Sequence, residues 1–186
     1  MTTRLITVFG GATPQPGEPA YDEAYRLGGL LGAAGYTVLT GGYSGTMEAV
    51  SRGAAEAGAH VIGVTCTLLE QWRPLGANRW VMEEIRHHTL RARMYDLIDR
   101  CDAALALPGG IGTLAEIAAT WSGIQTGDVI PKPLILIGPG WRATFDAMLA
   151  EFDGYVSPAY RTLIDHAPDV DAALALLRTR LHPPIA

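Results

Sequence analysis

The stretch Ala103-Ala-Leu-Ala-Leu-Pro-Gly-Gly-Ile-Gly-Thr-Leu-Ala-Glu116 decides which fold we expect for this chain. Residues 103–107 form a short, continuous apolar run, which is typical of a parallel strand that is buried on both faces. Pro108 ends this strand. The glycines at 109, 110 and 112 then predict a turn whose backbone can take positive φ and can approach a ligand closely.

A helix is expected directly after this turn. Apolar residues recur at helical spacing from Leu114 to Trp121, so Thr113 is predicted to be the N-cap and Glu116 to complete a capping box. The free N–H groups and the positive dipole end of such a helix attract anions. The turn is therefore either an anion site or an ordinary tight strand–helix connection, and the residue types alone do not separate the two. Its candidate ligand-binding residues are Gly109, Gly110, Ile111, Gly112 and Thr113.

The composition fits one domain that spans residues 1–186, because 48% of the residues are hydrophobic and can fill a sizeable core. The net charge is −5 and there is no basic block, so we expect no nucleic-acid partner. No apolar run is long enough to cross a membrane, and residues 5–9 are interpreted as a strand and not as a signal peptide. Cys66 and Cys101 lack metal-ligand spacing and fit two buried thiols in a reducing cytoplasm.

The chain alternates short apolar strands with helical patterns. Strands are expected at residues 5–9, 36–40, 60–64, 81–85, 103–107, 133–137 and 162–165, and helices at about 20–34, 46–57, 89–100, 113–124, 141–151 and 169–180. Residues 66–80 are expected to be irregular and can form a loop over a site. Repeated βα units of this kind predict a Rossmann-like α/β fold, a parallel sheet with helices on both faces.

A second glycine turn repeats the plan of the first. The sequence Leu39-Thr-Gly-Gly-Tyr-Ser-Gly-Thr-Met-Glu48 matches residues 107–116 in its strand end, paired glycines, Gly-Thr and carboxylate. Because the carboxyl ends of parallel strands share one edge of a sheet, both turns are expected to border one crevice. Glu48 can equally serve only to stabilise its helix N-terminus. The candidate binding residues at this edge are Gly10, Gly11, Gly41, Gly42 and Glu48.

Dinucleotide binding is not expected. The turn after the first strand is Gly10-Gly-Ala-Thr-Pro14, which is not the G-x-G-x-x-G fingerprint. The second strand ends in Thr40-Gly41 and lacks the acid that would hold a ribose hydroxyl. We therefore expect no nicotinamide cofactor, and the sequence indicates no other cofactor.

Arg93 lies on the apolar face of the helix that precedes the central strand, three residues after Leu90 and four before Leu97. An unpaired charge there is costly, which favours a phosphate or carboxylate partner. The alternative is a solvated arginine face that continues to neighbouring arginines at 86 and 100. His87 and His88 are expected to begin this helix as cap or surface residues, and the five histidines predict no metal site.

These residues resemble the LOG (Lonely Guy) family, long mislabelled as lysine decarboxylases, whose enzymes are cytokinin riboside 5′-monophosphate phosphoribohydrolases. Leu107-Pro-Gly-Gly-Ile-Gly-Thr-Leu-Ala-Glu116 fits the family motif PGGxGTxxE, and the similarity extends from residue 8 to about residue 151. The resemblance implies that Arg93, fifteen residues before the motif proline, and Glu116, the last motif residue, are the catalytic pair. Lysine decarboxylation is rejected, because the only lysine, Lys132, lies between two prolines in a predicted surface loop.

Two departures mark a divergent branch of that family. Arg93-Met94 stands where the family enzymes usually read Arg-Lys. The second turn, residues 41–48, stands where those enzymes have a longer triple-glycine loop that ends in Gly-Leu-Met-Gly.

The expected reaction is hydrolysis of the N-glycosidic bond of a nucleoside 5′-monophosphate, which gives the free base and ribose 5-phosphate. The glycine turn would bind the phosphate, Glu116 would stabilise positive charge on the ribose and activate water, and Arg93 would hold Glu116 or a substrate oxygen. The alternative is a nucleotide-binding sensor of the same fold that binds without turnover.

The resemblance also implies a homodimer whose site lies near the interface, because LOG dimers complete each site with helices of the neighbouring subunit. The helix expected at residues 113–124 has apolar material for such an interface, although Trp121 and its neighbours can instead form ordinary intrachain core.

Overall fold

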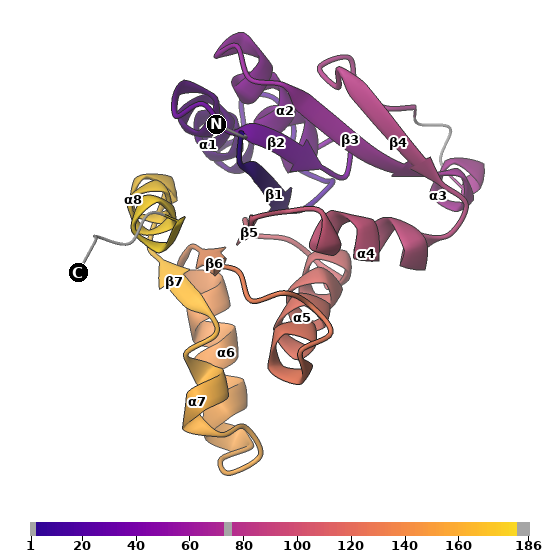
Figure 1. Ribbon diagram of the computed structural model, residues 1–186. Coiled ribbons are helices and arrows are strands. Elements are labelled where there is room, and N and C mark those ends of the chain that lie inside the picture. The colour runs from indigo at the N-terminus through magenta and orange to yellow at the C-terminus, as the bar shows by residue number, and fades with distance from the viewer. Residues whose placement is uncertain (1–2, 73–75, 182–186) are drawn as a thin grey trace.

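The structure is built on a seven-stranded sheet in which every strand pair is parallel (Figure 1). The computed structural model describes residues 3–72 and 76–181. The strand order is β4-β3-β2-β1-β5-β6-β7, so the direction of winding reverses between β1 and β5. The strands are β1 (Leu5–Phe9), β2 (Thr37–Thr40), β3 (Val61–Cys66), β4 (Glu83–His87), β5 (Ala103–Ala106), β6 (Leu134–Ile137) and β7 (Asp165–Ala167).

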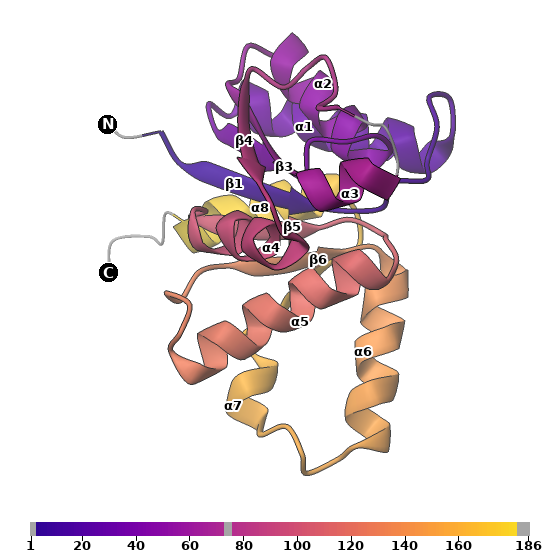
Figure 2. The same ribbon diagram turned by 90° about the vertical axis from the view of Figure 1, so that its right-hand side faces the viewer.

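Helices cover both faces of this sheet (Figure 2). One face carries α1 (Pro19–Ala33), α2 (Thr46–Glu56) and α8 (Val170–Leu181). The opposite face carries α4 (Leu90–Asp99), α5 (Ile111–Thr126) and α6 (Pro139–Glu151). Two short helices, α3 (Thr67–Trp72) and α7 (Pro158–Arg161), lie in the connections. The prediction of a Rossmann-like parallel sheet with helices on both faces is confirmed.

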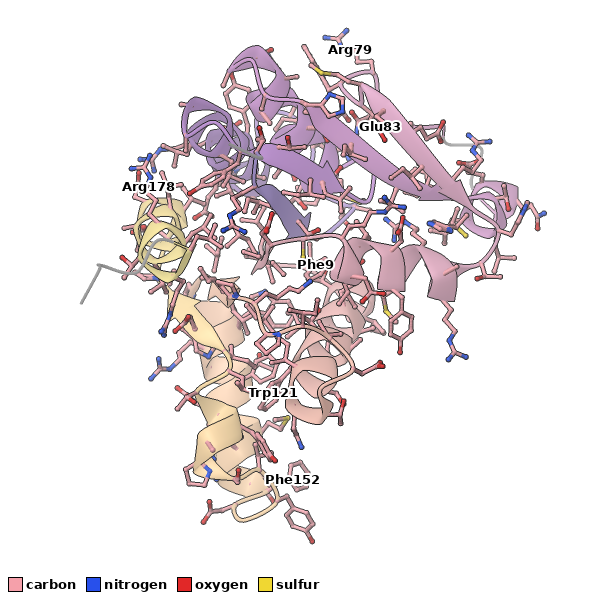
Figure 3. All side chains as sticks on the ribbon, in the orientation of Figure 1. Phe9, Arg79, Glu83, Trp121, Phe152 and Arg178 are labelled. Atoms are coloured by element: carbon pink, nitrogen blue, oxygen red, sulfur yellow. The ribbon has the colours of Figure 1, made fainter. Side chains whose placement is uncertain are left out.

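The alternation of side chains along the strands divides the core into two clusters. In β1, Ile6 and Val8 pack toward α1, α2 and α8, while Phe9 packs toward α4, α5 and α6. Figure 3 shows Phe9 on the side of the sheet that faces α4 and α5. Cys66 and Cys101 are buried free thiols, as expected.

Three expectations about local structure are wrong. Residues 67–72 form α3, although the region 66–80 was expected to be irregular; residues 73–75 lie outside the described part of the chain. The strand expected at 81–85 lies at Glu83–His87, because β4 is an exposed edge strand without an apolar run to mark it. His87 therefore ends a strand and does not begin a helix, and its Nε2 lies 2.9 Å from Asp96 Oδ2.

The start of α5 also differs from the expectation. The helix begins at Ile111 with Gly110 as N-cap, and the Leu114 N–H donates to the Gly110 carbonyl oxygen at 3.0 Å. Thr113 is thus the third helical residue and not the N-cap, and Glu116 is too far into the helix to complete a capping box.

The C-terminal third holds two further shifts. The strand expected at 162–165 lies at Asp165–Ala167, and the short helix α7 precedes it.

None of the helices in the described part of the chain combines the length and the apolar character that a bilayer-spanning helix needs.

Candidate functional site

A cavity of about 510 Å³ lies at the carboxyl ends of β1, β2 and β5. This is the edge where the strand order reverses, the usual ligand-binding position in open α/β sheets. Its walls come from the turns after β1 and β2, from the start of α2, from α3 and α4, and from the start of α5. Segments between residues 10 and 116 therefore converge on one space.

The turn after β1 is held by the start of α2. The backbone N–H and the hydroxyl of Thr46 both donate to the Gly11 carbonyl oxygen, at 2.9 Å and 3.0 Å. Gly45, the N-cap of α2, has φ of 73°, and a Cβ there would lie 2.5 Å from the same oxygen. The Gly11 N–H in turn donates to the Pro108 carbonyl oxygen at 3.3 Å. The three strand-end turns therefore support one another.

Arg93 extends from α4 under these turns, and its side chain is only 7% exposed. Its Nε donates to the Val64 carbonyl oxygen at 2.7 Å, and its Nη2 donates to the Gly41 carbonyl oxygen at 2.9 Å. A Cβ on Gly41 would collide with Arg93 Nη2, so glycine is required for this close approach. Burial lowers the pKa of Arg93, but a guanidinium remains protonated in proteins.

Glu116 lies opposite the free end of this guanidinium. Its Oε1 is 3.8 Å from Arg93 Nη1, and its side chain is 12% exposed. Burial raises the pKa of Glu116 from its ordinary 4.5 to about 7, against the lowering effect of Arg93. At neutral pH the carboxyl group is thus divided between its two protonation states, as suits an acid–base group.

The N-terminus of α5 forms the adjacent wall. Gly110, Gly112 and Thr113 line the cavity, and the first N–H groups of a helix have no partner within the helix. A Cβ on Gly110 or Gly112 would meet nothing within 4 Å, and neither residue has positive φ. The turn therefore leaves open space beside a helix dipole, which suits an anionic group.

A sequence profile of the SLOG cluster4 family matches residues 3–130, more than half of the chain. The chain belongs to the SLOG cluster4 family. A probable cytokinin riboside 5′-monophosphate phosphoribohydrolase of Oryza sativa subsp. japonica is 32% identical over 172 residues, which cover 89% of this chain and 74% of that protein. A cytokinin riboside 5′-monophosphate phosphoribohydrolase of Mycobacterium tuberculosis is 31% identical, over 91% of this chain and 92% of that protein. The resemblance to the LOG family is thereby confirmed.

A solved structure with a similar fold is the molybdenum cofactor binding protein from the phototrophic bacterium Rippkaea orientalis. It superposes with a TM-score of 0.76 at 23% identity, covering 97% of this chain and 99% of that one. At this identity the likeness concerns the fold alone.

The cavity at the carboxyl ends of β1, β2 and β5 brings together some of the predicted site residues and leaves others outside. Its walls include Gly10, Gly11, Arg93, Gly110, Gly112, Thr113 and Glu116. Ile111 does not line it and is 87% exposed. Gly41 and Gly42 do not line it either, although Gly41 holds Arg93 from behind. Gly109 lies against Thr113, whose hydroxyl occupies the space of a Cβ.

Glu48 is the second carboxylate that was expected at the crevice, and it does not line the cavity. Its negative charge instead contributes to raising the pKa of Tyr21 in α1, after the larger effect of burial. The repeated sequence plan thus places one carboxylate in the cavity, from α5, and turns the other toward α1.

Other cavity residues were not singled out as site residues from the sequence. Tyr43, Ser44 and Met47 line the wall next to Arg93, and Leu69 and Leu90 form an apolar rim. The sequence signal for Tyr43, Ser44 and Met47 is their position inside the repeated glycine turn of residues 39–48, between its glycines and its carboxylate.

Two remaining expectations concern ions and the single lysine. Among residues 3–72 and 76–181, no group of three His, Cys, Asp or Glu side chains is placed to hold a metal ion. Lys132 does not line the cavity, and its Nζ donates to the carbonyl oxygens of Ile98 and Cys101, both at 2.7 Å. Lys132 thus fastens the end of α4 to the start of β6.

Proposed function

We propose that this chain hydrolyses the N-glycosidic bond of a nucleoside 5′-monophosphate and releases the free base and ribose 5-phosphate. The observation that carries this proposal is the buried pair of Arg93 and Glu116, 3.8 Å apart, on the wall of a cavity that also contains a helix N-terminus. The relatives named as cytokinin riboside 5′-monophosphate phosphoribohydrolases support the reaction type. Cytokinin riboside monophosphates are accordingly the first substrates to test.

The phosphate of the substrate would bind at the start of α5. Backbone N–H groups of the turn from Gly109 to Thr113 would supply the donors, and of these residues Gly110, Gly112 and Thr113 line the cavity together with Gly10 and Gly11. The apolar rim of Leu69 and Leu90 leaves space on another wall for the base. This arrangement would place the ribose between the phosphate site and Glu116.

Glu116 would act on the ribose. As the C1′–N bond breaks, positive charge develops on the sugar, and a carboxylate beside it lowers the barrier. The same carboxylate can take a proton from the water that forms the new C1′–O bond, while the departing base gains a proton. Arg93 would hold Glu116 or a substrate oxygen through Nη1, because its other donors are bonded to Val64 and Gly41.

Substitution of Glu116 tests the proposal. Glu116→Gln should reduce base release by at least about a hundredfold, the range expected for an acid–base group, while nucleoside monophosphate binding remains measurable. The assay is chromatographic detection of free base with purified protein and several nucleoside monophosphates, alongside calorimetric binding. Glu151→Gln, at the end of α6 and away from the cavity, is the control. Undiminished turnover in the Glu116 variant would contradict the assignment.

The alternative, a nucleotide-binding sensor without turnover, predicts a different outcome of the same measurements. Binding would then be normal, and no nucleoside monophosphate would release its base even with the wild-type protein. Phosphate binding alone does not require a buried carboxyl group with a raised pKa, such as Glu116, opposite the guanidinium of Arg93. This feature therefore favours an enzyme over a sensor.

We also propose that the chain forms a homodimer with its cavity near the interface. Leu90, Ile111 and Leu114 expose apolar side chains on α4 and α5 beside the cavity. Trp121 does not belong to this surface, because its Nε1 donates to the Tyr160 carbonyl oxygen and its ring meets Phe145 edge-on. Sedimentation velocity at low micromolar concentration is expected to show a dimer, and a fully active monomer would refute this proposal.

We propose that the protein acts in the cytoplasm. Cys66 and Cys101 are both buried and free, which fits a reducing compartment. Fractionation of cells that produce the protein would test this location.

A further inference from the structure

The turn after β2 is where the sequence departs from the LOG pattern, and it places an aromatic residue in the cavity wall. Tyr43 follows the glycine pair in this turn and is only 6% exposed. It lines the same cavity as Arg93 and Glu116. The reaction proposed above assigns no role to it.

The hydroxyl group of Tyr43 is engaged by the end of β3. It accepts a hydrogen bond from the Cys66 N–H at 2.7 Å, and it lies 3.1 Å from the Cys66 carbonyl oxygen and 3.3 Å from Glu70 Oε1, to either of which it can donate. Burial raises the pKa of Tyr43, so the hydroxyl keeps its proton near neutral pH. A group bonded in this way is not free to donate to a ligand or to carry a proton.

The ring of Tyr43 is turned to the guanidinium of Arg93. The Arg93 Cζ lies 5.5 Å from the ring centroid, within the range of a cation–π contact. The ring face, the Val64 carbonyl oxygen and the Gly41 carbonyl oxygen then hold the guanidinium from three directions. Nη1 is the part left facing Glu116.

We infer that Tyr43 is a positioning residue, which acts through Arg93 to keep Nη1 directed at Glu116 and the ligand. The ring supplies this effect, and the hydroxyl serves to fix the ring against β3. The inference rests on the proposed function for its consequence in turnover, but the contact itself can also be tested by ligand binding alone.

The first experiment separates the ring from the hydroxyl. Tyr43→Leu removes the aromatic face and should lower kcat by about 2- to 30-fold, the range that a cation–π contact supports, with a smaller change in KM. Tyr43→Phe keeps the face and should retain more turnover than the leucine variant, although its Tm should fall because Cys66 loses its partner. Tyr36→Leu is the matched control for lost packing. Tyr36 is 7% exposed and directly precedes β2, whereas Tyr43 follows the other end of that strand.

A double-mutant cycle with Arg93→Gln then tests whether Tyr43 acts through Arg93. The affinity for adenosine 5′-monophosphate is measured by calorimetry in all four combinations, so the cycle is informative even if the wild type releases no base. Tyr43→Leu should weaken binding in the presence of Arg93 and should have little further effect in the Arg93→Gln background.

Three outcomes would overturn the inference. Equal losses from the leucine and phenylalanine variants would assign the effect to the hydroxyl. An equal effect of Tyr43→Leu in both Arg93 backgrounds would make the two residues independent. A kcat loss in Tyr36→Leu as large as in Tyr43→Leu would indicate a general loss of packing. If Tyr43→Leu does not fold, Tyr43→Met takes its place, because methionine adapts to irregular space without an aromatic face.

Discussion

Glu116→Gln should change how the stability of this protein depends on pH, whether or not the protein is an enzyme. Burial gives Glu116 a pKa of about 7 in the folded chain, against an ordinary 4.5. A carboxyl group whose pKa is raised on folding binds its proton more tightly in the folded state, so its contribution to stability is present at acid pH and is lost as the pH rises through about 7. From about pH 5 to about pH 8 this loss amounts to about 2–3 kcal/mol.

Urea unfolding of the wild type and the variant at several pH values measures this effect. Their difference in free energy of unfolding isolates Glu116, because the other titrating groups are shared. The wild type should lose about 2–3 kcal/mol relative to the variant across this range. Glu84→Gln is the control: a hydrogen bond from Thr65 lowers the pKa of Glu84 below its ordinary 4.5, so its contribution to stability changes only at more acid pH, and its difference from the wild type should stay nearly constant from about pH 5 to about pH 8. A constant difference between wild type and Glu116→Gln would refute the buried, raised-pKa description of the site.

Two further substitutions follow from the described contacts. Gly110→Ala should leave the free energy of unfolding within about 0.5 kcal/mol of the wild type, because the added Cβ meets open space. In calorimetry it should weaken binding of a nucleoside monophosphate more than binding of the unphosphorylated nucleoside. An equal loss for both ligands would count against a phosphate site there. Lys132→Met should lower the free energy of unfolding in urea by about 1–3 kcal/mol, because the Ile98 and Cys101 carbonyl oxygens lose a charged donor. Base release per folded molecule should persist. Loss of turnover without loss of stability would indicate a chemical role for the lysine.

Much of the sheet could be predicted from the sequence, because buried parallel strands are short apolar runs. The expected limits of β1 agree with the structure, and β5 and β6 are each within one residue. β4 was misplaced by two residues because an edge strand with exposed glutamates and an arginine has no such run. The start of α5 was misplaced because Thr113 has the chemistry of an N-cap, whereas its side chain instead fills the space above Gly109.

The candidate site was less accessible to sequence reasoning. The burial of Arg93 followed from its place on an apolar helical face, but its bond to Gly41 joins residues 52 positions apart and requires the folded sheet. Glu48 and Glu116 occupy equivalent places in two similar sequences, and only the packing of α2 against α1 separates their surroundings. The sequence places Tyr43 in a glycine turn but does not show that its ring faces the guanidinium of Arg93.

Within residues 3–72 and 76–181, the cavity is lined only by residues between 10 and 116, and β6, α6, α7, β7 and α8 contribute none of its walls. A hydrogen bond from Trp141 Nε1 in α6 to the Leu107 carbonyl oxygen, at 3.0 Å, joins this later region to the glycine turn of residues 107–116. The residues that line the cavity and the elements of the later region therefore occupy separate lengths of the sequence. We expect the segment around α6 and α7 to accept insertions or surface changes without altering the cavity lining, provided that Trp141 keeps its place.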